Sequence, residues 1–309
     1  MEGNLIIAVL ATAITAGTPL LYASLGELIT ERAGILNLGV EGIMLTGAVS
    51  GFICAYNTAN PWMGVLVAAG VGMLVALIHA FLTITLRANQ VVSGLAITLF
   101  GTGLSSFIGK AYVGKILPQS FKPFAIPGLA DIPYIGQIIF KHDALVYLSY
   151  ILVLAIYWYI YKTTPGLKMR ALGENPAAAD AMGINVFALR YMYVLIGGAL
   201  CGIAGAYLSL AYAPSWLENM TAGRGWIAVA LVIFALWNPV RALIGAYLFG
   251  GIDALGFHLQ VIGVPISVFF LNMLPYIFTI LVLVIVLVLK KGRIASPAAL
   301  GVAYNREER

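Results

Sequence analysis

The fold class is decided by residues 268–293, which read VFFLNMLPYIFTILVLVIVLVL and then KKGR. The first 22 residues carry no charge and are long enough to cross a bilayer as one helix. The basic residues that follow are typical of the cytoplasmic end of a span. The whole chain shares this character, since 61% of its 309 residues are hydrophobic and only 9% are charged. The sequence therefore predicts an all-α polytopic membrane protein.

Similar uncharged runs predict about nine membrane spans, or nine to ten, because glycine-rich stretches favour broken or re-entrant segments. The runs cover residues 3–26, 33–56, 62–86, 88–109, 144–161, 191–217, 225–240, 242–262 and 268–289. Together they form a single transmembrane domain over residues 1–309 and leave no room for a fused ATPase.

Basic residues predict the orientation of these spans. If the loop 162–190 is cytoplasmic, twelve of the 17 Lys and Arg residues lie inside and five lie outside. The N-terminus is then external and the tail 290–309 is cytoplasmic, as in a multi-pass protein of a bacterial cell (inner) membrane. The prolines of segment 112–143 predict a short external cap loop in place of a long helix. Because the basic residues are spread over short loops, no nucleic-acid partner is expected.

A weak internal repeat accompanies this topology. Glu41-Gly42 leads through an apolar run to Asn60-Pro61, and Arg224-Gly225 leads through another to Asn238-Pro239. The two segments cross the membrane in opposite directions, as in the inverted repeats of many transporters. The spacings differ and Asn-Pro is a frequent turn dipeptide, so both a possible inverted repeat and chance remain open.

Polar residues inside spans are costly and face a cavity or a partner. Glu41 and Asp253, each among glycines, either line a solute pathway or have a structural role. In that role they cap the backbone amides of a broken helix or, for Glu41, pair with Arg32 across the inner rim. A polar stripe at the start of the fourth span either lines the pathway or forms hydrogen bonds between helices. Glu27 and Glu31 are expected at the cytoplasmic rim. The candidate pathway residues are Asn37, Glu41, Asn89, Gln90, Ser93, Thr98 and Asp253.

The loop 162–190 contains a second candidate site. Asn175 and Pro176 are typical of a helix start, and the alanines that follow suit a short helix that ends at Gly183. Such a helix either docks into another protein or rests on the membrane surface. No catalytic triad, phosphate-binding loop or metal-ligand spacing is present in the sequence, and Cys54 and Cys201 are expected to pack in apolar surroundings. An enzyme is therefore disfavoured.

Three stretches carry a resemblance to a known family. They are GELITERAGILNLGVEG at 26–42, RALGENPAAADAMGI at 170–184 and GAYLFGGIDALG at 245–256. They resemble the permease subunits of ATP-binding cassette (ABC) importers of the branched-chain amino-acid, simple-sugar and nucleoside class. With Glu27 and Glu31, the first stretch is most similar to the nucleoside type, whose members work beside a longer second permease. Trp237 departs from the family, which usually has Gly before the Asn-Pro dipeptide.

The resemblance implies one half of the pore of an ATP-driven importer for a small polar solute, most similar to a nucleoside. Its partners would be a second, different permease subunit, a cytoplasmic ATPase that binds ATP and Mg²⁺, and an extracellular or lipid-anchored substrate-binding protein. This chain itself would bind no cofactor or metal and would have no catalytic residues. The residues matched to the ATPase-coupling helix are Arg170, Gly173, Glu174, Asn175, Ala178 and Ala179. The alternative is an ion-coupled secondary transporter that uses Glu41 and Asp253.

Overall fold

The computed structural model describes residues 2–262, 267–289 and 296–306. The long helices are α1 (Glu2–Arg32), α2 (Val40–Thr58), α3 (Pro61–Ala80), α4 (Gln90–Gly109), α6 (Ala144–Lys162), α9 (Val186–Tyr207), α11 (Pro239–Val261) and α12 (Val268–Leu289). The shorter helices are α5 (Ile135–Ile139), α7 (Thr164–Glu174), α8 (Pro176–Ala181) and α10 (Arg224–Phe234). The turns η1 (Phe81–Thr85), η2 (Lys110–Tyr112) and η3 (Leu208–Tyr212) extend α3, α4 and α9, and the strands β1 (Phe124–Ala125) and β2 (Lys141–His142) pair antiparallel.

The predicted all-α membrane fold is confirmed. Among the described residues, six helices are long and apolar enough to cross a membrane: Ile6–Arg32, Pro61–Thr85, Gln90–Tyr112, Ala144–Lys162, Val186–Tyr212 and Pro239–Val261. The count of nine spans stays a prediction. The basic anchor residues Lys290, Lys291, Arg293 and Arg309 lie outside the described residues.

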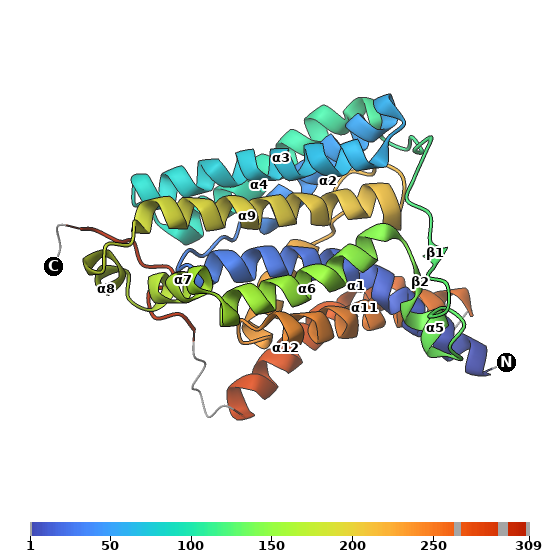
Figure 1. The fold of residues 1–309 in the computed structure, drawn as a ribbon. Coiled ribbons are helices and arrows are strands. Elements are labelled where there is room, and N and C mark those ends of the chain that lie inside the picture. The colour runs from blue at the N-terminus through green and yellow to red at the C-terminus, as the bar shows by residue number, and fades with distance from the viewer. Residues whose placement is uncertain (1, 263–266, 290–295, 307–309) are drawn as a thin grey trace.

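The helices form a bundle with two distinct ends (Figure 1). The N-terminus, α5 and the β1–β2 hairpin lie at one end, here called the cap end, and α7, α8 and residues 296–306 lie at the other, here called the loop end. Helices α1 and α9 pack against each other and run in opposite directions. Helix α9 also packs on α2 and α3, whereas α1 packs on α11. The paired helices α1 and α9 therefore form the core of the bundle.

The packing supports the inverted repeat. If α1, α2, α3 and α4 correspond to α9, α10, α11 and α12, the packing is the same in both halves. Helix α1 packs on α11 as α9 packs on α3. Helix α2 packs on α9 and α4 as α10 packs on α1 and α12. Both Asn-Pro dipeptides begin a helix, because Asn60 caps α3 and Asn238 caps α11 with a side chain that accepts two backbone N–H groups. The first repeat therefore comprises α1–α4 and the second comprises α9–α12.

Close packing at the centre depends on small residues. A Cβ atom at Gly202 of α9 would overlap the backbone of Ala68 in α3, and one at Gly205 would overlap the backbone of Met44 in α2. The helix backbones therefore touch directly, as is common between membrane helices.

The structure differs from the predicted spans where the first two helices meet. Helix α1 continues to Arg32, beyond the predicted end at residue 26, and α2 begins only at Val40, although the uncharged run starts at residue 33. Residues 33–39, here called the link, are not helical, and Gly34 has a φ angle of 86°. A backbone without helical hydrogen bonds needs other partners inside a membrane protein. The residues that supply them form the first part of the candidate site.

Candidate functional site

Two side chains supply partners for the amide groups of the link. Gln90 Oε1 accepts a hydrogen bond from the Leu36 N–H at 2.8 Å, and Glu27 Oε1 accepts one from the Asn37 N–H at 2.8 Å. The Asn37 side chain in turn accepts the Gly39 N–H at 2.9 Å. Gln90, Glu27 and Asn37 are all buried. These polar side chains satisfy a backbone that would otherwise be unpaired in the bundle.

The carbonyl groups of the link are bound in the same way. The Thr98 hydroxyl donates to the Leu38 carbonyl oxygen at 2.9 Å, and His79 Nε2 lies 3.1 Å from the Leu36 carbonyl oxygen. The other ring nitrogen of His79 lies 2.9 Å from the Ser93 hydroxyl. The predicted polar stripe of α4 therefore exists, and in this structure it is directed at the link. Sequence reasoning passed over His79 because an isolated histidine carries no motif.

Asn89 lies apart from that group. It is exposed at the start of α4, where its side chain accepts the N–H groups of Val91 and Val92 at 3.0 and 3.1 Å. It therefore acts here as the helix N-cap.

Glu41 joins the two broken segments. Its Oε1 accepts hydrogen bonds from the Thr221 hydroxyl at 2.6 Å and the Gly223 N–H at 2.8 Å, and its Oε2 accepts the Gly225 N–H at 2.6 Å. Gly223 is the N-cap residue of α10. A Cβ atom at Gly225 would overlap the Glu41 backbone, so the starts of α2 and α10 are in direct contact. The carboxylate offsets the partial positive charges of both helix N-termini.

The capping interpretation of Glu41 is therefore realised in the structure. The alternative pairing of Glu41 with Arg32 is not, because the guanidinium of Arg32 donates to the Trp237 carbonyl oxygen at 3.1 and 3.2 Å. Whether Glu41 also lines a pathway stays a prediction. Asp253 forms an ion pair with Arg224, with Nη2 and Oδ2 3.1 Å apart.

Glu31 and Trp237 connect α1 with the turn between α10 and α11. The indole N–H of Trp237 donates to Glu31 Oε2 at 2.5 Å, so the residue that departs from the family pattern has a defined partner. Glu27 and Glu31 are buried inside the bundle, in the last two turns of α1. Their place at the cytoplasmic rim stays a prediction, whereas their burial was not predicted, because a glutamate at the end of a hydrophobic run shows no sign, in sequence, that two non-helical segments fold against it.

Helices α7 and α8 lie at the loop end, next to the C-terminal segment (Figure 1). Asn175 Oδ1 accepts the Ala178 N–H at 3.0 Å, and α8 ends before Gly183, whose φ angle is 78°. The predicted capped helix is thus confirmed. The residues matched to the coupling helix divide into the exposed Glu174, Asn175 and Ala178, the buried Gly173 and Ala179, and the half-buried Arg170, which lies over the Tyr161 ring.

The C-terminal segment 296–306 binds this loop, which sequence reasoning did not predict. The Ala299 N–H donates to the Gly173 carbonyl oxygen at 2.8 Å. Asp180 accepts the Tyr304 hydroxyl at 3.0 Å and the Arg306 guanidinium at 2.8 and 2.9 Å. The hydrogen bond and the charge of Asp180 raise the pKa of Arg306 above its ordinary value. No local pattern pairs residues this far apart; the only signal is a single acidic residue in an alanine run.

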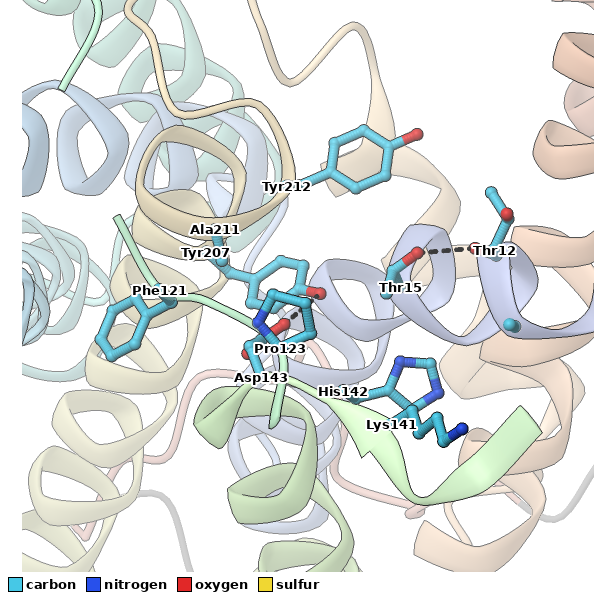
Figure 2. Close-up of a pocket in the computed structure, with 11 residues that line it drawn as sticks. Thr12, Thr15, Phe121, Pro123, Lys141, His142, Asp143, Tyr207, Ala211 and Tyr212 are labelled. Carbon is cyan, nitrogen blue, oxygen red and sulfur yellow. Dashed lines mark hydrogen bonds between the residues drawn. The ribbon is translucent and has the colours of Figure 1, made fainter. Parts of the chain in front are cut away.

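A polar pocket opens at the cap end (Figure 2). It has a volume of about 330 Å³, and Thr12 and Thr15 of α1 face Tyr212 and the β2 region across it. Asp143 at its wall accepts the Tyr207 hydroxyl at 3.3 Å and caps α6. Burial raises the pKa of Asp143 and lowers that of His142. No three His, Cys, Asp or Glu side chains come together as a metal-ligand set among the described residues.

Comparisons with known proteins place this geometry in a family. A family model described as "Branched-chain amino acid transport system / permease component" matches residues 9–289. A Haloferax volcanii protein that carries the provisional name glucose ABC transporter permease protein TsgC13 is 44% identical over 95% of this chain and 96% of its own length. The nucleoside ABC transporter permease protein NupC of Lactococcus lactis is 37% identical over 97% of both chains. The guanosine ABC transporter permease protein NupQ of Bacillus subtilis is 38% identical over 94% of both.

A solved structure supports the fold. An ABC transporter described provisionally as of the metal-chelate type, in an inward-facing conformation, has a TM-score of 0.51 and 16% identity over 92% of this chain and 85% of that chain. At this identity the likeness shows the fold alone.

The relatives are permease subunits, so the chain is a multi-pass membrane protein and not an enzyme, and the ATPase is a separate subunit. The family generally works with ATPase and substrate-binding partners. Family membership thus favours the permease over the self-sufficient secondary transporter. The resemblance seen in the sequence is confirmed: this chain belongs to the branched-chain amino acid transport system permease family of ABC transporters.

Proposed function

We propose that this chain forms one half of the translocation pathway of an ATP-driven importer of nucleosides. A second, different permease subunit completes the pore, and an extracellular or lipid-anchored binding protein delivers the solute. ATP and Mg²⁺ bind the cytoplasmic ATPase and not this chain. The names of two relatives, one a nucleoside permease and one a guanosine permease, support the solute class.

The observation that carries the proposal is the meeting of two broken helices inside the bundle. Transporters commonly place their solute where discontinuous helices meet, because the exposed backbone ends there offer polar contacts. Here Glu41 already occupies the positive end of α10 with three hydrogen bonds. An anionic solute would meet a carboxylate and no free helix end. A neutral, polar solute such as a nucleoside therefore fits this junction better than an anion.

The loop end supplies the contact with the ATPase. Glu174, Ala178 and Met182 present an exposed surface on and beside α8, and Met182 is 82% exposed although its side chain is apolar. A single exposed apolar side chain is common on protein surfaces, so the docking surface rests on the residues matched to the coupling helix and Met182 only extends it. Sequence reasoning missed Met182, since the exposure of one methionine depends on how α8 packs.

A contiguous set of contacts leads from this surface to the broken helices. The backbone at Gly173 touches the end of α1 at Arg32, where any larger residue would overlap the Arg32 carbonyl oxygen. Arg32 in turn binds the Trp237 carbonyl oxygen at the turn between α10 and α11. Movement of α7 and α8 by the ATPase would therefore reach α10 through the end of α1.

Glucose is the second candidate solute, because one relative carries a glucose permease name at 44% identity. Uptake of labelled uridine, guanosine and glucose should be measured in vesicles that contain this chain with its co-expressed partners. We expect ATP-dependent uptake of a nucleoside that excess unlabelled glucose does not reduce. Uptake of glucose alone would replace the nucleoside assignment, and uptake driven by an ion gradient without ATP would contradict the importer.

The ATPase contact needs its own test. Ala178→Trp should abolish co-purification of the ATPase, because the indole would occupy the docking surface. The control is Ala155→Trp, on an exposed part of α6 away from the loop end, which should leave the complex intact. Equal recovery of the ATPase with both variants would contradict the docking surface.

A further inference from the structure

An ion pair lies open inside the membrane region, beside the start of α10. Arg224 and Asp253 are joined at 3.1 Å, and their side chains are 18% and 26% exposed. The guanidinium lies over the Tyr212 ring, 5.8 Å from its centre. From α12, Tyr276 donates its hydroxyl to the Ala222 carbonyl oxygen at 2.8 Å. Both tyrosines are exposed, so two aromatic rings lie open beside the start of α10.

The depth of the pair excludes a lipid-facing position. Asp253 lies within the apolar helix Pro239–Val261 and eight residues before its end, which places it about 12 Å from the cap end of α11. A charged pair at that depth faces water or another polar surface, because lipid cannot solvate it. Leu255, two residues further, is 49% exposed and apolar, as a lipid-facing position requires. The opening at Asp253 therefore faces a polar environment and not lipid.

The pair is continuous with the pocket at the cap end. Tyr212 lines the 330 Å³ pocket and also lies under the Arg224 guanidinium, so one side chain borders both (Figure 2). Thr12 and Thr15 also line this pocket. Tyr212 therefore places the ion pair directly beside a polar pocket of the cap end.

The ion pair differs from the neighbouring Glu41 in how much of its side chains stays open to a ligand. Both carboxylate oxygens of Glu41 accept hydrogen bonds from the start of α10. Glu41 is buried, with only 5% of its surface exposed. Arg224 Nη1 donates to the Thr221 carbonyl oxygen at 3.4 Å and Nη2 to Asp253 Oδ2 at 3.1 Å, and both side chains stay partly exposed. An adjacent donor and acceptor with aromatic faces nearby matches the edge and the plane of a nucleobase.

We propose that Arg224, Asp253, Tyr212 and Tyr276 form a solute-contact site that binds the base of a nucleoside in the pathway. This inference rests on the proposed function for its solute class. Arg224 and Asp253 bind the polar edge of the base, and the two tyrosines pack on its faces. Because the pair has no net charge, it favours a neutral ring over an ion.

Accessibility tests the position of the site. In the full complex with Cys54→Ser, Asp253→Cys and Tyr212→Cys should react with a thiol reagent that does not cross membranes, added from the binding-protein side. Saturating uridine should slow both reactions at least fivefold, whereas Leu255→Cys should not react. Tyr212→Cys leaves the ion pair intact, so it keeps the test valid if Asp253→Cys does not assemble. Lack of reaction at both positions, or reaction that uridine does not slow, would overturn the site.

Kinetics separate solute contact from a structural role. Asp253→Asn should raise the KM for uridine at least tenfold with unchanged recovery of the complex. The double variant Arg224→Asp, Asp253→Arg exchanges the two charges and should restore assembly if either single variant lowers it. Its KM for uridine should stay high, because the hydrogen-bond donor and acceptor have changed places. Restoration of a normal KM by the exchange would show that the pair is only structural and overturn the proposal.

The wild-type complex separates this inference from the proposed function. If it takes up glucose and no nucleoside, the nucleoside importer fails on uptake alone, whatever the cysteine variants do. Protection of Asp253→Cys by glucose and not by uridine would then overturn the nucleobase assignment. Nucleoside uptake together with unreactive Asp253→Cys and Tyr212→Cys would leave the proposed function intact and overturn the site.

Discussion

The starts of α2 and α10 occupy equivalent places in the inverted repeat but are stabilised in opposite ways. The link before α2 is bound by side chains of α1, α3 and α4, and its N-cap, Gly39, has no side chain of its own to cap the amides of α2. The start of α10 receives the Glu41 carboxylate, which comes from α2 itself. One repeat therefore supplies the charge that stabilises the other.

The difference teaches that a shared backbone path does not imply shared chemistry. The polar side chains around the link bind its backbone or, as Ser93 does with His79, one another, so that region is closed. Around the start of α10, Glu41 is fully engaged while Arg224 and Asp253 keep an open side. The second repeat is thus the half that we expect to meet the solute.

The largest effect is expected at Glu41. Glu41→Ala leaves two amides and one hydroxyl at the α10 start without their acceptor, and should lower the free energy of unfolding by about 3–5 kcal/mol. Glu41→Gln should lose less, since the amide retains one acceptor. Thermal unfolding of the detergent-solubilised complex measures both. Glu174→Ala on the exposed loop end is the control, and equal loss in Glu41→Ala and Glu174→Ala would remove the asymmetry between the repeats.

The next effect concerns the link. Thr98→Val and Gln90→Leu each remove a side-chain partner of the link, and each should lower the free energy of unfolding by about 1–3 kcal/mol. The matched control is Thr102→Val, because the Thr102 hydroxyl donates to the Thr98 carbonyl oxygen within α4 and not to the link. Hydrogen exchange of the amides at 33–39 should accelerate in Gln90→Leu and not in Thr102→Val. Unchanged exchange in Gln90→Leu would argue against side-chain support of the link.

A smaller effect is expected at the N-cap of α10. Gly223 has a φ angle of 82°, and a Cβ atom there would overlap the Tyr276 hydroxyl. Gly223→Ala should therefore cost about 1–2 kcal/mol in backbone strain plus the displaced tyrosine. Gly114→Ala shares the positive φ of 76° but has open space around it, so it measures the strain alone. If Gly223→Ala and Gly114→Ala unfold at the same temperature, the Tyr276 contact contributes nothing to the stability of the α10 start.

The smallest effect is expected for Tyr276→Phe, which keeps the ring and removes one hydrogen bond to the Ala222 carbonyl oxygen. The free energy of unfolding should fall by about 0.5–1 kcal/mol, the usual net value of one such bond. Tyr134→Phe, at an exposed position in the cap region, provides the baseline in the same unfolding assay. A loss above that of Gly223→Ala would mean that Tyr276 is a main support of the α10 start.

Local features were predictable because their causes are local. The runs of uncharged residues predicted the apolar helices, and Asn175 with Pro176 predicted the start of α8, which the structure confirms. The two Asn-Pro dipeptides belonged to the suggested repeat, and the structure shows that each of them begins a helix. For Glu41 and for the α4 stripe, the sequence left two alternatives open, and it did not predict that Glu27 binds the link and Glu31 binds Trp237.

By itself, the sequence determined the membrane class, the family and the capped start of α8, because hydrophobic length and capping act between neighbouring residues. Only the tertiary structure decided which side chain forms a hydrogen bond or ion pair with which distant group. Glu41 caps a helix whose first residues lie about 180 positions away in the chain, and Asp180 binds the C-terminal Tyr304 and Arg306. Inside a membrane protein every backbone amide and every charge needs a partner, and the partner is whichever group the folded helices bring within reach.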